Sequence, residues 1–149
     1  MGNKKAEVLE FGILDESGNR VNRLTSGRRY TFYFSAILYT NLKEVAVGFL
    51  IRDIKGVDLF GINNMKKQIQ IPYTSRGDLI HACMDATMWL TNGTYFLSLG
   101  IADPLADSNP YYDFRYDALQ FAVETKKGIL AGSVVDLDAE MQIDGLNLV

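Results

Sequence analysis

The fold of this chain is decided by Leu90-Thr91-Asn92-Gly93-Thr94-Tyr95-Phe96-Leu97-Ser98-Leu99-Gly100-Ile101-Ala102. Asn92-Gly93 predicts a turn, because both residue types reach positive φ angles at little cost. After the turn, apolar side chains occupy every second position, at Tyr95, Leu97, Leu99 and Ile101. A period of two places these side chains on one side of a strand, so the stretch predicts a turn that leads into a half-buried β-strand.

The spacing Leu-x-x-Gly-x-Tyr over residues 90–95 resembles the tyrosine corner of immunoglobulin-like sandwiches. In that motif, the hydroxyl of a tyrosine near the start of a late strand donates a hydrogen bond to nearby backbone. An ordinary hairpin strand with a buried tyrosine would account for the same residues. Both interpretations require neighbouring strands, because a strand is not stable alone.

Further segments of the chain alternate apolar and polar residues in the same way. The longest, residues 28–39, is followed by a second at residues 44–54. Residues 78–90 also fit a helical spacing, but their alternation and their strand-like surroundings favour a strand. Shorter strands are expected at residues 8–14, 57–62, 116–124 and 132–137. Residues 104–115, which include Pro110, are expected to form a long loop.

About eight strands, separated by turns rich in Gly, Asn and Asp, predict an all-β protein. The expected architecture is an immunoglobulin-like antiparallel β-sandwich. It forms one domain over residues 6–137, and residues 138–149 form a C-terminal tail that is frayed or helical. The side chains expected inside the sandwich are Tyr30, Phe32, Phe34, Val47, Phe49, Ile51, Tyr95, Leu97, Leu99, Leu119, Phe121 and Val123.

At 149 residues, the chain is long enough to bury a core without a metal ion or a disulfide. Its net charge is −3, and its basic residues occur in short pairs rather than in a stripe, which argues against binding to nucleic acid. The single cysteine, Cys83, excludes an intrachain disulfide and favours the cytoplasm. Because no apolar run approaches the roughly 20 residues of a membrane-spanning helix, we expect neither a signal peptide nor a membrane span.

The sequence contains none of the motifs that hold nucleotides or metals: no phosphate-binding loop, no dinucleotide fingerprint and no cluster of Cys and His. His81 is the only histidine, and its position within an expected strand favours a packed or surface role over catalysis. Four acidic residues flank the expected loop but lack the spacing of a calcium site: Asp103, Asp107, Asp113 and Asp117. We therefore predict a protein that is not an enzyme and that binds no cofactor and no metal.

Several weak motifs become informative when their order and spacing are taken together. They are Asp53-x-x-Gly56-x-x-x-x-Gly61-x-Asn63, Leu90-x-x-Gly93-x-Tyr95 with Gly100-Ile101, Asp117-Ala118-Leu119-x-Phe121-x-Val123 and Gly132-x-Val134-x-x-Leu137. Over residues 6–137, this order resembles the C-terminal domain of Wzt-type ABC-transporter ATPase subunits. Asn64 departs from the family pattern, which often has threonine at this position.

The resemblance implies a non-catalytic carbohydrate-binding module that recognises the finished, end-modified O-antigen polysaccharide of lipopolysaccharide. Recognition would take place at the cytoplasmic face of the inner membrane, before export. The resemblance also implies the ATPase and membrane subunits of the transporter as partners in the full-length protein. It further implies a homodimer with an exchanged C-terminal strand, which we expect at residues 132–137. The alternative function is a non-catalytic dimerisation or protein-docking β-sandwich.

The outward side chains of three expected strands form a surface on which a sugar could bind. Small residues would make a trough there: Ala46, Gly48, Gly100, Ala118 and Ala122. Sugar rings stack on aromatic side chains, and their hydroxyls form hydrogen bonds. The predicted carbohydrate-binding residues are Arg52 and Gln120 as hydrogen-bond donors, Phe96 as a stacking ring, Ser98 beside it, and Tyr111 and Tyr112 at one end. The alternative is that the small residues accommodate a packed neighbour such as a partner chain.

Overall fold

A computed structural model describes residues 4–71, 73–106, 111–125 and 134–143 of the chain. Its strands are β1 (Ala6–Leu14), β2 (Arg23–Thr25), β3 (Arg29–Leu38), β4 (Ala46–Asp53), β5 (Asp58–Asn63), β6 (Leu79–Thr87), β7 (Gly93–Ala102) and β8 (Tyr111–Glu124). None of the described residues is helical, so no helix able to cross a membrane occurs among them. The all-β prediction is confirmed, and the segment that also fitted a helix contains the strand β6.

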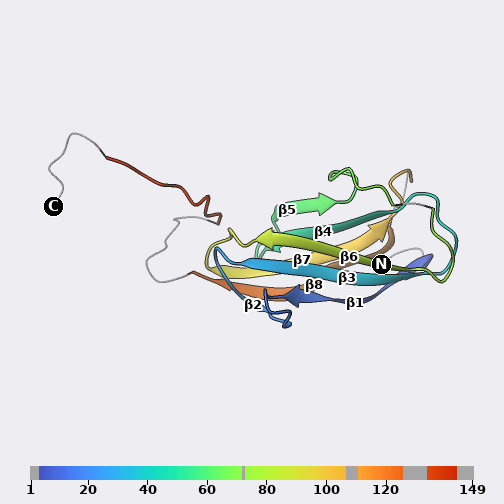
Figure 1. Cartoon of the computed structure of the whole chain (residues 1–149), viewed down its shortest axis with the longest axis horizontal. Helices are drawn as coiled ribbons and strands as arrows, with labels where there is room; N and C mark the ends of the chain where they lie inside the picture. The colour runs from blue at the N-terminus through green and yellow to red at the C-terminus, as the bar shows by residue number, and fades with distance from the viewer. Residues whose placement is uncertain (1–3, 72, 107–110, 126–133, 144–149) are drawn as a thin grey trace.

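Two sheets pack face to face. The first contains three strands in the order β1-β3-β6, and the second contains five in the order β2-β8-β7-β4-β5. β2 runs parallel to β8, with Arg23 beside Ala122, whereas all the other neighbours are antiparallel. Figure 1 shows β3 and β6 in front of β7 and β8, and the two layers together make the predicted β-sandwich.

The core lies between the sheets and contains aromatic contacts that cross from one sheet to the other. The ring centroids of Phe32 and Phe121 lie 5.8 Å apart, and those of Phe34 and Phe49 lie 5.3 Å apart. Both pairs meet edge to face, which is a geometry that the ring quadrupoles favour. The predicted core residues are buried, with two half-buried exceptions that pack against the core: Val47 and Leu119.

Tyr95 forms the predicted tyrosine corner at the start of β7. Its hydroxyl donates a buried hydrogen bond of 2.8 Å to the backbone carbonyl of Thr91. Burial raises the pKa of the Tyr95 hydroxyl. The prediction that Asn92-Gly93 supplies a positive φ was wrong, because neither residue adopts one. Gly93 instead leaves room for the Tyr95 side chain, since a Cβ there would lie 3.2 Å from the Tyr95 hydroxyl, which is a tight contact.

Strand β8 begins at Tyr111 rather than at the predicted residue 116, and its pairing with β7 contains a bulge. The prediction of a loop over residues 104–115 was therefore wrong from Tyr111 onward. Leu97 pairs with Leu119, but Leu99 pairs with Arg115. Residues 116–118 of β8 therefore lie opposite the single residue Ser98 of β7. In this bulge, Asp117 has a φ of 47°, and its amide donates a hydrogen bond of 2.8 Å to the Ser98 hydroxyl.

An ion pair on β8 joins the two sheets near this bulge. Arg115 lies 2.9 Å from the Asp113 carboxylate, which also accepts a hydrogen bond of 2.8 Å from the Val8 amide of β1. Arg115 donates a second bond of 3.1 Å to the Val8 carbonyl. Burial alone would raise the pKa of Asp113, but the hydrogen bonds from Arg115 and Val8 and the Arg115 charge outweigh it, so the pKa is lowered. The pair thus holds both backbone groups of Val8, where the register of β1 shifts.

Residues 134–136 lie beside the start of the stretch that decides the fold. Val135 forms an isolated antiparallel bridge with Leu90. The Thr91 amide donates a hydrogen bond of 2.7 Å to the Val134 carbonyl, and the Asp136 amide donates one of 2.6 Å to the Trp89 carbonyl. The predicted strand at residues 132–137 is only a bridge in its described part, and residues 132 and 133 lie outside the described residues. The bridge forms within one chain here, and its exchange between two chains stays a prediction.

Candidate functional site

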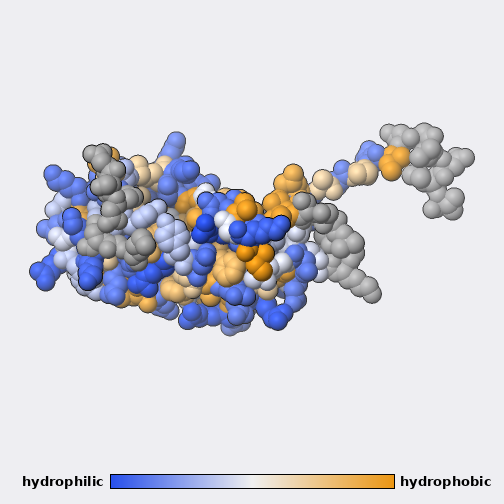
Figure 2. All heavy atoms as spheres, turned by 180° about the vertical axis from the view of Figure 1, so that it is seen from behind, coloured by the Kyte–Doolittle hydropathy of each residue, from blue (hydrophilic) through white to orange (hydrophobic). Residues whose placement is uncertain are grey.

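The outer face of the five-stranded sheet brings three predicted site residues together. Arg52 on β4 pairs with Phe96 on β7, and Phe96 pairs with Gln120 on β8. Residues directly opposite each other project from the same face, with Cβ atoms about 5 Å apart. Figure 2 shows the side of the molecule that lies behind in Figure 1, where polar and apolar residues are interspersed. We call Arg52, Phe96 and Gln120 the Arg52 row.

A carboxylate on β5 positions Arg52. The Nε atom of Arg52 donates a hydrogen bond of 3.0 Å to the Oδ1 atom of Asp58. The register of β4 and β5 shifts just before Arg52, which places Asp58 opposite it. The Arg52 side chain is 27 % exposed and that of Asp58 is 62 % exposed. The guanidinium is therefore held against the sheet, while its terminal N–H groups have no partner among the described residues.

Three aromatic side chains of β8 form a second feature, the aromatic cluster of Tyr111, Phe114 and Tyr116. The centroid of the Phe114 ring lies 4.8 Å from that of Tyr111 and 4.5 Å from that of Tyr116. A hydrogen bond with Tyr116 raises the pKa of the Tyr111 hydroxyl. Tyr116 is exposed, and the other two rings are half-buried. The cluster is thus ordered by its own contacts and still presents ring surface to solvent.

Gly100 allows the aromatic cluster to lie against the sheet. Phe114 pairs with Gly100, and a Cβ on Gly100 would come within 2.5 Å of the Cδ2 atom of the Phe114 ring. On its other side, Gly100 pairs with Gly48 of β4, and Ala102 pairs with Ala46. Small residues of β4 and β7 therefore lie side by side on this face, and the Phe114 ring covers Gly100.

The Arg52 row and the aromatic cluster lie along the same strands. Phe96 and Gly100 are four residues apart on β7. At about 3.3 Å per residue, this separation is about 13 Å. Two aromatic positions with hydrogen-bonding groups beside them therefore share one face of the sheet.

The structure places the predicted site residues in two groups. The outer face holds Arg52, Phe96, Gln120 and Tyr111. Ser98 is fully buried, because the bulge in β8 lies over it, and the Asp117 amide in that bulge donates a hydrogen bond to the Ser98 hydroxyl. Tyr112 is also buried, its hydroxyl donates a hydrogen bond of 3.2 Å to the Glu44 carbonyl, and burial raises its pKa. The expectation that Ser98 and Tyr112 line the surface was wrong.

Sequence reasoning missed Phe114, Tyr116 and Asp58 as members of this face. The alternation Phe114-x-Tyr116 was the available signal for a strand, but the expected loop obscured it. No comparable signal marked Asp58, because only the register shift between β4 and β5 brings it to Arg52.

The titratable side chains away from this face can be compared with the requirements of a metal site and of a catalytic triad. Among the described residues, no three or more His, Cys, Asp or Glu side chains gather closely enough to hold a metal ion. Asp107, which belongs to the acidic set noted in the sequence, lies outside those residues. The Nδ1 atom of His81 lies 2.9 Å from the Ser35 hydroxyl, whereas Asp85 accepts a hydrogen bond of 2.5 Å from Thr31. The nearby Asp85 carboxylate therefore bonds Thr31, and the partner of His81 is a serine hydroxyl, whereas a catalytic triad pairs its histidine with a carboxylate.

Comparisons with known proteins identify a family model and solved structures that are similar to this chain. The family model described as the Wzt C-terminal domain matches residues 1–137. A crystal structure of the C-terminal domain of Wzt is 26 % identical at a TM-score of 0.84, and the match covers 96 % of this chain and 86 % of that chain. The alkylpurine DNA glycosylase AlkC of Pseudomonas fluorescens shares only the fold, at 8 % identity and a TM-score of 0.50, over 80 % of this chain and 30 % of that chain. No curated protein sequence matches the chain.

Proposed function

Because this chain belongs to the Wzt C-terminal domain family, we propose that it is a non-catalytic domain that binds the end-modified O-antigen polysaccharide for export. Family membership associates the chain with an ABC transporter. In the proposal, its partners are the ATPase and membrane subunits of that transporter, and it acts at the cytoplasmic face of the inner membrane.

The observation that carries the proposal is the presence of the Arg52 row and the aromatic cluster on one face. Aromatic rings stack on the apolar faces of sugar rings, while amide and charged groups bind the hydroxyls. Phe96 and Tyr116 supply ring surface, and Arg52 and Gln120 supply hydrogen-bond donors. Arg52 can also bind an anionic terminal group, because a guanidinium donates two parallel hydrogen bonds to a carboxylate or phosphate.

The proposal includes a homodimer in which residues 134–136 are exchanged. Each chain already forms the bridge between Leu90 and Val135 with its own residues. A second chain can supply the same contact, and such an exchange is a low-cost route to a symmetric dimer.

Calorimetric titration with the O-polysaccharide of the organism that encodes this chain tests the binding face. We expect Arg52→Ala, Phe96→Ala, Gln120→Ala and Tyr116→Ala each to weaken binding about tenfold to a hundredfold, or about 1–3 kcal/mol, without changing the melting temperature. Tyr73→Ala is the matched control, because it removes an aromatic ring that is 60 % exposed and that belongs to the segment between β5 and β6.

The outcomes separate the two candidate functions. If all four variants bind like the parent chain, this face is not the binding site. If the parent chain binds no polysaccharide but still forms a dimer, the function is dimerisation or protein docking. The exposed apolar side chains beyond the bridge, such as Leu137 and Met141, would favour that second function.

A further inference from the structure

The outer face of the three-stranded sheet is the second broad surface of the sandwich. It is formed by β1, β3 and β6, and none of the described strands lies over it. Figure 1 shows β3 and β6 in front of the other sheet. This surface is therefore directed away from the face that carries the Arg52 row and the aromatic cluster.

At the centre of this surface, Tyr33 of β3 lies across a glycine of β1. Tyr33 pairs with Gly12, and a Cβ on Gly12 would lie 2.9 Å from the Tyr33 hydroxyl and 3.1 Å from the Cε1 and Cζ atoms of the ring. Gly12 is buried, whereas Tyr33 is half-buried. A glycine inside a strand weakens the strand and often marks a close approach. Gly12 thus leaves the space in which the ring packs on the sheet while its other side faces solvent.

The same arrangement occurs on the opposite face, at Gly100 and Phe114. In both places a glycine of one strand lies directly opposite an aromatic residue of its neighbour. A Cβ would approach the aromatic side chain to 2.9 Å at Gly12 and to 2.5 Å at Gly100. Phe114 belongs to the aromatic cluster of the proposed binding face. Tyr33 therefore gives the second surface a ring that is held against its sheet in the same way.

Hydrogen-bonding side chains flank Tyr33 in both directions along the strands. On one side, the Thr31 hydroxyl donates a hydrogen bond of 2.5 Å to the Oδ1 atom of Asp85. On the other side, the Ser35 hydroxyl lies 2.9 Å from the Nδ1 atom of His81. Each pair is two residues from Tyr33, or about 7 Å along the strands. A pyranose ring stacked on Tyr33 would therefore have its hydroxyls within reach of both pairs.

The charges beside Tyr33 indicate which sugars fit. Asp85 is exposed, and so is Glu10, which lies opposite Ser35. Two carboxylates beside the ring repel an anionic ligand and accept hydrogen bonds from the hydroxyls of an uncharged one. The Arg52 row differs, because its guanidinium favours an anionic group. The two faces are therefore suited to different parts of a polysaccharide.

We propose that Tyr33, with the Thr31–Asp85 and Ser35–His81 pairs, is a second sugar-binding site for uncharged pyranose rings. It rests on the proposed function and adds a division of roles. The face with Arg52 receives the modified end of the polysaccharide, and the Tyr33 site binds uncharged sugars away from that end.

The only cysteine of the chain provides a direct readout of this site. Cys83 is exposed and pairs with Tyr33, so a sugar stacked on the ring shields its thiol. We expect the O-polysaccharide of the organism that encodes this chain, at a saturating concentration, to slow the reaction of Cys83 with N-ethylmaleimide at least about threefold. Mass spectrometry of the intact chain measures the rate.

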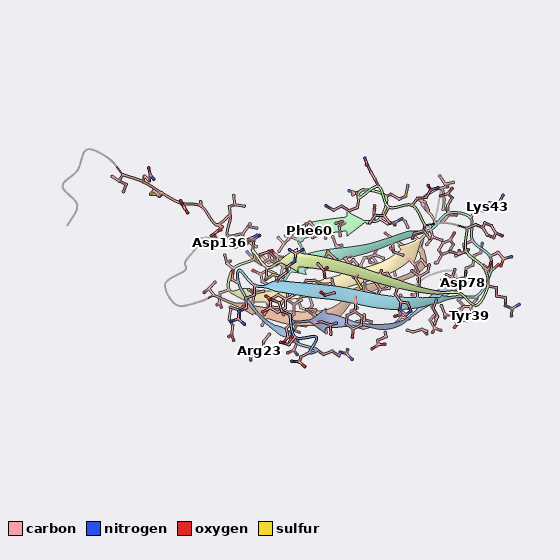
Figure 3. The ribbon with its side chains drawn as sticks, in the orientation of Figure 1. Arg23, Tyr39, Lys43, Phe60, Asp78 and Asp136 are labelled. Carbon is pink, nitrogen blue, oxygen red and sulfur yellow. The ribbon has the colours of Figure 1, made fainter. Side chains whose placement is uncertain are left out.

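Three variants test whether the Tyr33 ring causes the protection. Tyr33→Ala should abolish it, whereas Tyr33→Phe keeps the ring and should retain most of it. Tyr39→Ala is the matched control, because it removes a ring that is 46 % exposed six residues further along the chain. Figure 3 shows Tyr39 at the end of the sandwich. All reactions are compared well below the melting temperature of each variant.

The outcomes separate this site from the proposed function. If calorimetry shows binding but Cys83 is not protected, or if Tyr33→Ala is protected as well as the parent chain, the second site is overturned and the proposed function stands. Protection that persists in Arg52→Ala, while its calorimetric affinity falls, supports two separate sites. Protection that is lost in Arg52→Ala overturns a separate second site. The absence of both binding and protection overturns both proposals.

Discussion

At the scale of single residues, the hydrogen bond from Tyr95 to Thr91 anchors the start of β7. The bond is buried and 2.8 Å long. Tyr95→Phe leaves the Thr91 carbonyl without this donor, so we expect the free energy of unfolding to fall by about 1–2 kcal/mol in urea titrations. Tyr39→Phe removes a hydroxyl bonded to Glu7 at an exposed position and should change stability much less, because water replaces the lost bond. Equal effects of the two variants would contradict a role for the corner.

Gly100 is a second position at which one added carbon atom, a Cβ, would disturb the structure. A Cβ there would lie 2.7 Å from the Asp113 carbonyl as well as against the Phe114 ring. We expect Gly100→Ala to lower stability by about 1–3 kcal/mol and to displace Phe114 from the binding face. Gly61→Ala is the control, since the nearest atom to its Cβ would be the Cδ1 atom of Leu50 at 3.4 Å. Thermal melting of both variants measures the difference, and a Gly100→Ala variant as stable as Gly61→Ala would contradict this reasoning.

At the scale of elements, the ion pair of Asp113 and Arg115 makes the contact between β8 and β1 sensitive to acid. The pKa of Asp113 is lower in the folded protein than in the unfolded chain. The ionised carboxylate therefore stabilises the fold fully above the unfolded pKa of about 3.9, and this contribution is lost as the pH falls through the folded pKa. We expect urea titrations from pH 7 to pH 2 to show this loss in the parent chain and not in Asp113→Asn.

A charge-removal variant tests the cause of that pH dependence. Arg115→Met leaves the ionised Asp113 carboxylate without its cation in a largely buried site. This variant should be most destabilised at neutral pH and should approach the parent chain as Asp113 becomes protonated. An unchanged acid sensitivity in Arg115→Met would show that another carboxylate is responsible.

The strands and the core could be predicted because alternation is a local property of the sequence. Phe32, Phe34 and Leu97 are buried as expected, since each lies in an uninterrupted run with a period of two. The bulge in β8 could not be predicted, because it depends on the pairing of Ser98 with a backbone amide 19 positions later in the chain. The bulge also affected the predicted site: Arg52, Phe96 and Gln120 lie together as expected, whereas Ser98, on the same side of the sheet, is buried beneath the bulge instead of exposed.

At the scale of the whole molecule, assembly should depend on the segment after β8. We expect light scattering to show a dimer at micromolar concentration and a monomer after deletion of residues 131–149. The melting temperature of the parent chain should rise with protein concentration, because association stabilises the folded state by mass action. The control is the melting temperature of the deleted chain, which should not depend on concentration. A dimer that survives the deletion would contradict strand exchange.

The parallel pairing of β2 with β8 also determines when the molecule can fold. Arg23, near the start of the chain, lies beside Ala122, near its end, and β8 contacts β1, β2 and β7. Such pairings between distant segments slow folding to milliseconds or seconds, compared with the microseconds of many helical bundles. During synthesis, the apolar sides of β3 and β7 must remain exposed until β8 has left the ribosome. Until β8 is available, these exposed apolar strand faces make the nascent domain prone to aggregation.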